Sequence, residues 1–311
     1  MRRISYGSCD SYRMTPITEV EGRRLSLSNL DKVLHPATGT TKGEVLHYYA
    51  ATAAGAILPH LRDRPVSFLR YPDGAGGRSS SPRIRRPVRP TGCAPPRPRS
   101  EDPGARQVMV QDLASLMWAA NLVVEFHTPQ WRADAPEIAD RMVFDLDPGS
   151  PATVVECCAV ACWLRERLAA DGLFAYGKTS GSKGLHLLVP LEPAPAAEVS
   201  AYARRLAVEA EDALPDLALH RMKRALRPGK VFVDFSQNSA SKTTATPYTL
   251  RARAEPTVSA PVTWDEIEGC RAPEALVFRA DDMAGRLERY GDLLGPLLDP
   301  DRARPLPPGP G

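Results

Sequence analysis

The chain has 311 residues, which suits one large domain or two small ones and is long enough to bury a sizeable core. It contains no stretch of about 18 consecutive apolar residues, which excludes a membrane-spanning helix. The formal net charge of +3 says little about partners, but Arg and Lys are clustered locally, and local clusters matter more than the total for binding nucleic acid.

The six cysteines show none of the paired C-x-x-C spacing that marks a zinc site, and nothing before them resembles a signal peptide. We therefore expect reduced thiols in a cytoplasmic protein, with Cys157, Cys158 and Cys162 on one helix. The other three cysteines are Cys9, Cys93 and Cys270.

Residues 1–21 lack apolar periodicity and are expected to form a disordered extension. Thr41 and Glu44 then form the Thr-x-x-Glu pattern of a capping box, which predicts a helix from there to about Ile57. The following run "RPVSFLRYP" predicts a strand. From 78 to 103 the chain is dense in Arg and Pro with almost no apolar residue, so we expect a disordered loop or insertion.

The rest of the chain mixes helical and strand patterns. Helices are predicted for "QDLASLMWAANL", for a segment that is capped by Ser150-Pro151 and ends near Gly172, and for residues 196–214 and 281–290. A second capping-box pattern joins Thr263 and Glu266. Strands are predicted for "VVEFHTPQW", "RMVFDLDPG", 174–178, 185–190 and "KVFVDFSQN".

This mixture lacks strict alternation of strands and helices, which favours an α+β fold over a doubly wound sheet. We expect one domain over residues 22–295. The tail, residues 296–311, is expected to be too proline-rich to fold.

The stretch "FDLDPG" places two carboxylates, Asp145 and Asp147, on one face at the end of an apolar strand. Side chains of like charge this close repel each other unless a cation lies between them. Taken alone, the pattern fits a polar strand end beside a turn better than a functional site. A third carboxylate, Asp234, ends another apolar strand, and three such groups together could hold Mg²⁺ or Mn²⁺. A nuclease would fit this pattern as well as a polymerase.

Two further groups of residues suit a phosphate ligand. In "TSGSKGLHLLVP", two glycines surround Ser180 and Lys183 in a turn that could hold a triphosphate, and His186 follows on the next strand. The spacing is not that of a Walker loop, and a hairpin turn with a satisfied histidine is the simpler interpretation of this stretch alone. Basic and amide side chains also cluster around Asp234 in the sequence: Arg227, Lys230, Gln237, Asn238, Lys242, Arg251 and Arg253.

Four separate stretches, in the same order, resemble the polymerase domain of bacterial DNA ligase D, in the archaeo-eukaryotic primase superfamily. They are "NLDKVLHPATGTTK", "VFDLDPG", "TSGSKGLHLLVPL" and "KVFVDFSQNSASKTTATPYTLRAR", and the resemblance covers residues 22–77 and 107–295. It implies a primase-polymerase core with mixed and antiparallel sheets and flanking helices around a central groove. It also implies a two-metal nucleotidyltransferase that adds NTPs or dNTPs to 3′-ends at gaps and double-strand breaks, in non-homologous end joining.

The resemblance also implies roles for individual residues. Two ions, Mn²⁺ or Mg²⁺, are expected on Asp145, Asp147 and Asp234. The incoming nucleotide and catalytic centre are expected to involve His127, Ser180, Lys183, His186, Arg227, Gln237 and Arg251. A pocket for the 5′-phosphate of a DNA gap or break is expected from Asn29, Lys32 and Lys42, because two lysines and an amide bind a terminal phosphate dianion more strongly than an internal diester. Without the resemblance, these three would be interpreted as a loop and helix start with solvated lysines.

The sequence departs from the family after "RYPDGAGG", where relatives carry aromatic residues that stack on template DNA and this chain continues with "RSSSPR". Stacking contributes about 1–3 kcal/mol per base, so weaker template binding is expected. The segment 78–103 is either a local frameshift or a divergent loop. Three functions therefore remain open: a polymerase, a catalytically weak module that binds DNA ends, and a metal-dependent nuclease.

No Lys-x-Asp-Gly ligase signature occurs in the sequence. Ligation would therefore need a separate ATP-dependent DNA ligase, and the resemblance implies the end-binding protein Ku as a further partner. It also implies a location at the nucleoid.

Overall fold

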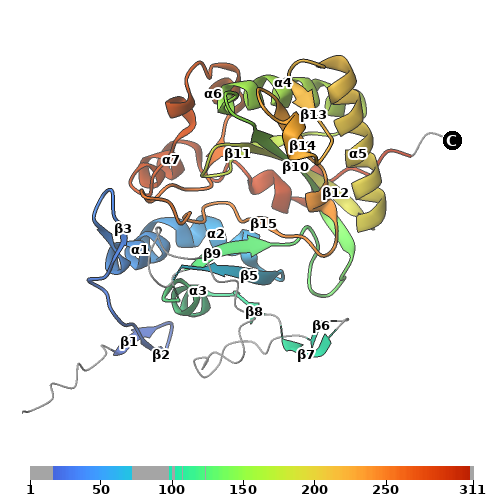
Figure 1. Ribbon diagram of the computed structural model, residues 1–311. Coiled ribbons are helices and arrows are strands. Elements are labelled where there is room, and N and C mark those ends of the chain that lie inside the picture. The colour runs from blue at the N-terminus through green and yellow to red at the C-terminus, as the bar shows by residue number, and fades with distance from the viewer. Residues whose placement is uncertain (1–16, 72–97, 100–101, 107, 123, 309–311) are drawn as a thin grey trace, which may run out of the picture.

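The computed structural model describes residues 17–71, 98–99, 102–106, 108–122 and 124–308. Two sheets of six and four strands form its centre, with helices packed against them. In Figure 1 the larger sheet lies above the smaller one. The predicted α+β class is confirmed.

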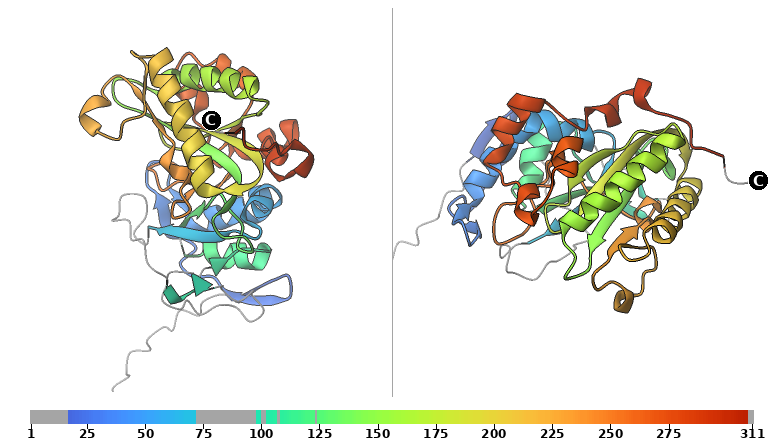
Figure 2. Two further views of the ribbon diagram at one scale, coloured as in Figure 1. Left: turned by 90° about the vertical axis from the view of Figure 1, so that its right-hand side faces the viewer. Right: turned by 90° about the horizontal axis from the view of Figure 1, so that it is seen from above.

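The larger sheet carries the predicted carboxylates. Its strand order is β13 (Ala218–Leu219), β14 (Val231–Asp234), β10 (Ile138–Pro148), β12 (Leu185–Pro195), β11 (Tyr176–Thr179) and β16 (Pro261–Val262). Helices α4 (Val154–Ala170) and α5 (Ala196–Ala213) cover its outer face, as Figures 1 and 2 show. Because side chains alternate along a strand, Phe144 and Leu146 pack in the core against these helices. Asp145 and Asp147 point to the opposite face.

The smaller sheet has the order β15 (Thr244–Ala245), β9 (Val124–Thr128), β5 (Pro65–Arg70) and β8 (Val108–Met109). Helix α1 (Lys42–His47), a π-helical segment (Tyr48–Ala53), α2 (Ala54–Leu61) and α3 (Leu113–Ala120) pack against it. Tyr49, Phe68 and Phe126 meet edge to face in this second core.

Helix starts test the capping predictions directly. The capping box of Thr41 and Glu44 is present, although the helical segment runs on to Leu61 rather than ending near Ile57. The box at Thr263 opens α6 (Trp264–Glu268), and α7 (Asp282–Tyr290) lies close to its predicted range. The predicted cap at Ser150 is wrong. Thr153 caps α4 instead, because its hydroxyl accepts from Val155 N–H and Glu156 satisfies Thr153 N–H.

Two segments that were expected to lack structure are partly folded. β1 (Ile17–Val20) pairs with β2 (Arg23–Ser26), so the expected disorder of residues 1–21 is wrong for β1, whereas 1–16 lie outside the described residues. β6 (Pro98–Arg99) pairs with β7 (Asp102–Arg106), and most of the segment 78–103 also lies outside them. A further small hairpin joins β3 (Val33–His35) and β4 (Thr40–Thr41).

The C-terminal tail differs from expectation up to residue 308. Leu297 is buried, Leu306 packs against the larger core, and Glu192 N–H donates to the Arg304 carbonyl. Proline excludes a regular helix or central strand, but its neighbours can still bury leucines and accept hydrogen bonds.

The described cysteines, Cys157, Cys158, Cys162 and Cys270, are free thiols, and the first three lie on α4 as predicted. Within the ranges that the structure describes, no helix is long and apolar enough to cross a membrane.

Candidate active site

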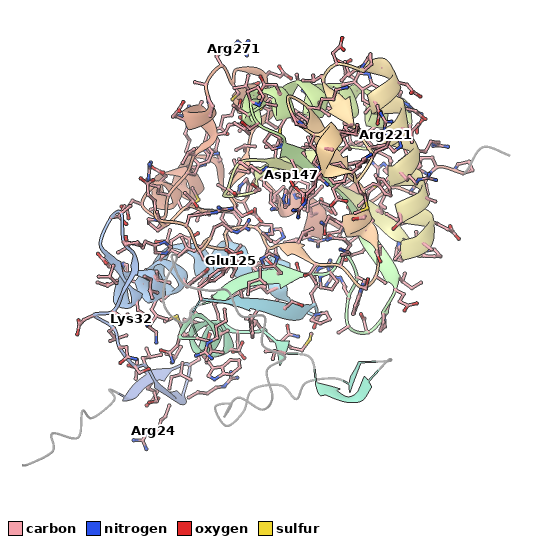
Figure 3. The ribbon with its side chains drawn as sticks, viewed as in Figure 1. Arg24, Lys32, Glu125, Asp147, Arg221 and Arg271 are labelled. Carbon is pink, nitrogen blue, oxygen red and sulfur yellow. The ribbon has the colours of Figure 1, made fainter. Side chains whose placement is uncertain are left out.

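The three predicted carboxylates lie together on one face of the larger sheet, opposite the face that α4 and α5 cover. Asp145 on β10 is the direct cross-strand partner of Asp234 on β14, and Asp147 is two residues further along the same face. Directly opposed residues in an antiparallel pair have Cβ atoms about 4.5–5.5 Å apart, close enough for their carboxylates to share a cation. Figure 3 labels Asp147 on this face, with Glu125 of the smaller sheet below it.

Each carboxylate is held by its own hydrogen-bond or charge partners. Asp234 accepts from Ser236 Oγ at 2.6 Å and from Gln237 Nε2 at 3.0 Å. Asp145 Oδ1 lies 3.3 Å from His186 Nε2. In the part of the chain that the structure describes, no group of three or more His, Cys, Asp or Glu side chains is arranged as a ready metal site.

Asp147 is 42% exposed and faces two cations. Its Oδ1 lies 3.9 Å from Lys183 Nζ and its Oδ2 lies 4.0 Å from Arg227 Nη1. Burial and the neighbouring Asp145 carboxylate raise the pKa of Asp147, against the opposing effect of the two cations. Burial also raises the pKa of Asp145, but the contact with His186 and the charges of Lys178 and Arg251 outweigh it, so the net pKa is lowered. Asp145 thus disfavours the charged form of Asp147, and a cation bound between the two carboxylates would relieve this repulsion.

The "TSGSKG" turn between β11 and β12 is compact and is held by hydrogen bonds within the turn. Ser180 Oγ accepts hydrogen bonds from the N–H groups of Ser182 and Gly184, at 3.2 and 3.0 Å. A Cβ at Gly184 would lie 2.3 Å from the Leu146 carbonyl, so only glycine lets the turn approach β10 this closely. Lys183 Nζ donates to the Pro148 carbonyl at 2.8 Å, which anchors the lysine beside Asp147.

A cavity of about 300 Å³ lies beside this turn and is bordered by Lys183, Thr257 and Phe278. Asp145, Asp147 and Asp234 are not among its lining residues. Pro148 and Lys183, which adjoin Asp147, do line it, so the cavity lies next to the carboxylates without including them.

His186 belongs to a row of polar side chains that crosses four strands. In register, Asp234 pairs with Asp145, Asp145 with His186, and His186 with Lys178 on β11. Lys178 is completely buried, and its Nζ lies 3.0 Å from His186 Nδ1 and 2.7 Å from Ser259 Oγ. Burial and the nearby Arg251 charge lower the pKa of Lys178 to about 7.

The smaller sheet brings His127 and Arg251 to the same region through Glu125. The Glu125 Oε2 atom lies 3.0 Å from His127 Nε2 and accepts from Arg251 Nε at 2.9 Å, and Oε1 accepts from Ala252 N–H at 2.8 Å. Arg251 also donates to the Ser180 carbonyl, which ties the smaller sheet to the turn. Burial raises the pKa of Glu125, but His127 and Arg251 outweigh it and lower the pKa to about 2.

Arg227 completes the cationic side of the site. Its guanidinium stacks on Phe232, 3.8 Å from the ring centroid, and its Nη2 donates to the Met222 carbonyl at 3.2 Å. Phe232 is the cross-strand partner of Asp147, so the stacking directs Arg227 toward that carboxylate.

The three residues expected to bind a 5′-phosphate lie together near the start of α1. Lys32 N–H donates to the Asn29 carbonyl and Lys42 N–H to the Lys32 carbonyl, at 3.1 and 2.8 Å. Lys42 is buried, and its Nζ donates to the Ser28 carbonyl at 2.7 Å. Burial, followed by the charges of Lys32 and Arg70, lowers the pKa of Lys42 to about 8. Figure 3 shows Lys32 well apart from Asp147, so this cluster and the carboxylates are two separate sites.

Sequence reasoning missed Glu125 and Lys178. Glu125 lies two residues before His127 on β9, so both point to one face, and this spacing was a usable signal. Lys178 ends a predicted strand two residues before Ser180, but nothing in the local sequence marks it as buried.

Three comparisons with known proteins agree on one family. A family model described as "LigD, primase-polymerase domain" matches residues 41–294. The chain is 42% identical over 278 residues to the multifunctional non-homologous end joining protein LigD of Mycolicibacterium smegmatis, a match that covers 88% of this chain and 36% of that protein. It is 28% identical over 272 residues to the bifunctional non-homologous end joining protein LigD of Bacillus subtilis, covering 86% of this chain and 43% of that one.

A solved structure extends the agreement to the fold. The polymerase domain from Mycobacterium tuberculosis Ligase D in complex with DNA is 40% identical, with a TM-score of 0.81, and the match covers 88% of this chain and 98% of that chain. The present chain spans 36% and 43% of the two LigD proteins above. Since the family model covers most of the sequence and the fold agrees, the chain belongs to the family of LigD primase-polymerase domains.

Proposed function

We propose that this chain is a two-metal nucleotidyltransferase that adds NTPs or dNTPs to the 3′-ends of DNA at gaps and double-strand breaks, in non-homologous end joining. The observation that carries the proposal is the direct cross-strand pairing of Asp145 with Asp234, with Asp147 on the same face. A nuclease could share these carboxylates, but family membership and the adjoining "TSGSKG" turn favour a polymerase.

Asp145, Asp147 and Asp234 form an all-oxygen donor set that suits Mg²⁺ or Mn²⁺. The two ions would favour ionisation of the primer 3′-hydroxyl and neutralise the leaving pyrophosphate. Gln237, which donates to Asp234 at 3.0 Å, would lie beside the bound nucleotide.

The protein's own cations would position the triphosphate. Lys183 and Arg227 flank Asp147 at about 4 Å, so both can exchange that contact for phosphate oxygens when the carboxylate binds a cation. His127 on β9 and Arg251, in the segment that follows β15, face the same region and are held by Glu125. Charges supplied from both sheets would align the α-phosphorus with the attacking hydroxyl.

The cluster of Asn29, Lys32 and Lys42 would bind the 5′-phosphate on the far side of a gap. Lys32→Ala should selectively reduce affinity for gapped DNA that carries this phosphate, measured against the same gap without it. Equal losses on both substrates would contradict the assignment. By analogy with the family, Ku and a separate ATP-dependent ligase would be the protein partners.

Primer extension on a gapped duplex with a 5′-phosphate, Mn²⁺ and labelled nucleotides tests the proposal. Extension by the wild type that is lost in Asp145→Ala would support a polymerase. Binding without extension would support the alternative, a module that recognises the 5′-phosphate without efficient synthesis. Shortening of the primer would support the nuclease.

A further inference from the structure

Lys178 is a buried cation that the mechanism above does not use. It lies on β11, on the opposite side of His186 from Asp145. Its Nζ lies within hydrogen-bond distance of two side chains, His186 and Ser259. Burying an ammonium is costly unless hydrogen bonds compensate. The contacts with His186 and Ser259 must therefore offset the cost of burying Lys178.

The hydrogens of this cluster have one consistent assignment. Ser259 Oγ donates its only hydrogen to the Thr179 carbonyl at 2.9 Å, so it must accept from Lys178 Nζ. His186 Nε2 faces the Asp145 carboxylate at 3.3 Å and must carry a hydrogen, because two lone pairs would repel there. A neutral imidazole then has a bare Nδ1, which accepts from Lys178 at 3.0 Å. Charged or neutral, Lys178 has enough hydrogens to donate to both partners.

We infer that Lys178 is a positioning residue, which fixes His186 as the Nε2–H tautomer and aims that N–H at Asp145 and at the phosphates of a bound nucleotide. This inference rests on the proposed function for its consequence, but not for the hydrogen-bond assignment itself. A histidine at this position is useful because it donates a hydrogen bond without adding charge beside the metal-binding carboxylates. Lys178 would act only through His186, since its own contacts lie on the far side of the ring.

The matched variants are Lys178→Met, which keeps the approximate length but has no donor, and Lys178→Gln, which keeps an N–H donor without the charge. The readout is the pair of ring ¹⁵N resonances of His186 in the full-length chain, free of nucleotide and metal. His186→Gln identifies these signals among those of the six histidines. Lys223→Met, at an exposed lysine, controls for nonspecific changes in the spectrum.

The wild type and Lys178→Gln should show His186 as Nε2–H with Nδ1 accepting a hydrogen bond. Lys178→Met should shift the Nδ1 signal and add a second ring orientation. In extension assays, Lys178→Met should raise the KM for the nucleotide by about tenfold, and Lys178→Gln should recover most of that loss.

An Nδ1–H tautomer in the wild type would overturn the inference. An unchanged Nδ1 signal in Lys178→Met would also overturn it. Equal increases of KM in Lys178→Met and Lys178→Gln would do the same, because they would show that the charge or packing of Lys178 matters and its hydrogen bond does not. If Lys178→Met does not fold, Lys178→Gln and Ser259→Ala carry the test, since loss of the Ser259 acceptor should also shift the Nδ1 signal. If the wild type extends no primer, the proposed function fails while the spectrum still decides the role of Lys178.

Discussion

Glu125 shows how one buried carboxylate can orient an arginine and a histidine at a site. It accepts from Arg251 Nε and Ala252 N–H and pairs with His127 Nε2, and only 3% of its surface is exposed. Neither His127 nor Arg251 has to be ordered by the ligand, because Glu125 holds both beforehand. Preorganisation of this kind lowers the cost of binding a charged nucleotide.

Glu125→Gln should destabilise the fold at neutral pH. The folded-state pKa is lowered from 4.5 to about 2, which corresponds to roughly 3 kcal/mol of stability at most. Because the folded pKa is the lower one, this contribution is complete above pH 4.5 and is lost as the pH falls toward 2. Urea unfolding of both proteins at several pH values would show a difference that shrinks on acidification.

Glu255→Gln is the matched control for this experiment. Glu255 pairs with Arg279 at the surface, where its side chain is 39% exposed, and surface pairs of this kind contribute about 0–1 kcal/mol. If Glu125→Gln cost no more than this control, or the same amount at every pH, the role given to Glu125 would be wrong.

The lowered pKa of Lys42 makes the preference for a 5′-phosphate depend on pH. With a pKa of about 8 instead of 10.5, Lys42 is charged at pH 7 and loses its charge over the next two pH units. A bound phosphate raises this pKa, so the midpoint in complexes should lie above 8. The ratio of affinities for phosphorylated and unphosphorylated gaps, measured by fluorescence anisotropy at fixed ionic strength, should fall between pH 7 and 10.

Lys42→Arg keeps its charge over that range, so its ratio should stay flat. The interpretation would be abandoned if the wild-type ratio were also flat, or if the variant followed the same pH profile.

At the scale of elements, local sequence patterns predicted the strands and turn that carry the site. Alternation along β10, the Thr-x-x-Glu caps and the glycines of the "TSGSKG" turn all depend on residues that are close in sequence. The sequence pattern predicts the N-cap of α4 at Ser150, three residues before its position in the structure, because Ser150 and Thr153 are both favourable N-cap residues. Glu156 completes a box only with Thr153, and this decides between them.

Contacts between distant residues could not be predicted in the same way. Glu125 and Arg251 are 126 positions apart, and Lys178 and Ser259 are 81 apart. The direct pairing of Asp145 with Asp234 depends on strand register, which local patterns leave open. The family resemblance supported the grouping of the carboxylates and named His186, but it contained no information about Glu125 and Lys178, the buried side chains beside His127 and His186.

Gly184→Ala tests how closely the turn must approach β10. The added Cβ would lie 2.3 Å from the Leu146 carbonyl, so the turn or the strand must move, one residue from Asp145 and Asp147. We expect a stability loss of about 1–3 kcal/mol and a larger than tenfold loss of extension activity, measured at a temperature where the variant is folded.

Gly55→Ala, inside α2, is the comparison. Nothing lies within 4 Å of its added Cβ, and alanine is favoured over glycine in a helix by about 1 kcal/mol, so this variant should gain stability and keep its activity. Full activity in Gly184→Ala would show that the close approach is not needed.

At the scale of the whole molecule, residues 292–306 join the two sheets, and we call this segment the C-terminal strap. Asp292 accepts from Tyr248 Oη at 2.7 Å and pairs with His60 of α2 at 2.8 Å, on the side of the smaller sheet. Leu294 and Leu297 pack with Val143 and Leu188 of the larger sheet. The carboxylates and the Glu125 group come from different sheets, so the strap helps set the distance between the two halves of the site.

Asp292→Ala should therefore affect both stability and nucleotide binding. It leaves buried His60 and Tyr248 without their acceptor, which should cost about 2–4 kcal/mol and lower the Tm by several degrees. At a temperature where the variant stays folded, KM for the nucleotide should rise severalfold, because Arg251 and His127 no longer lie at a fixed distance from Asp145. Asp301→Ala, at an exposed aspartate of the same strap, should change neither quantity appreciably. A normal KM in a destabilised Asp292→Ala would mean that the strap stabilises the fold without positioning the site.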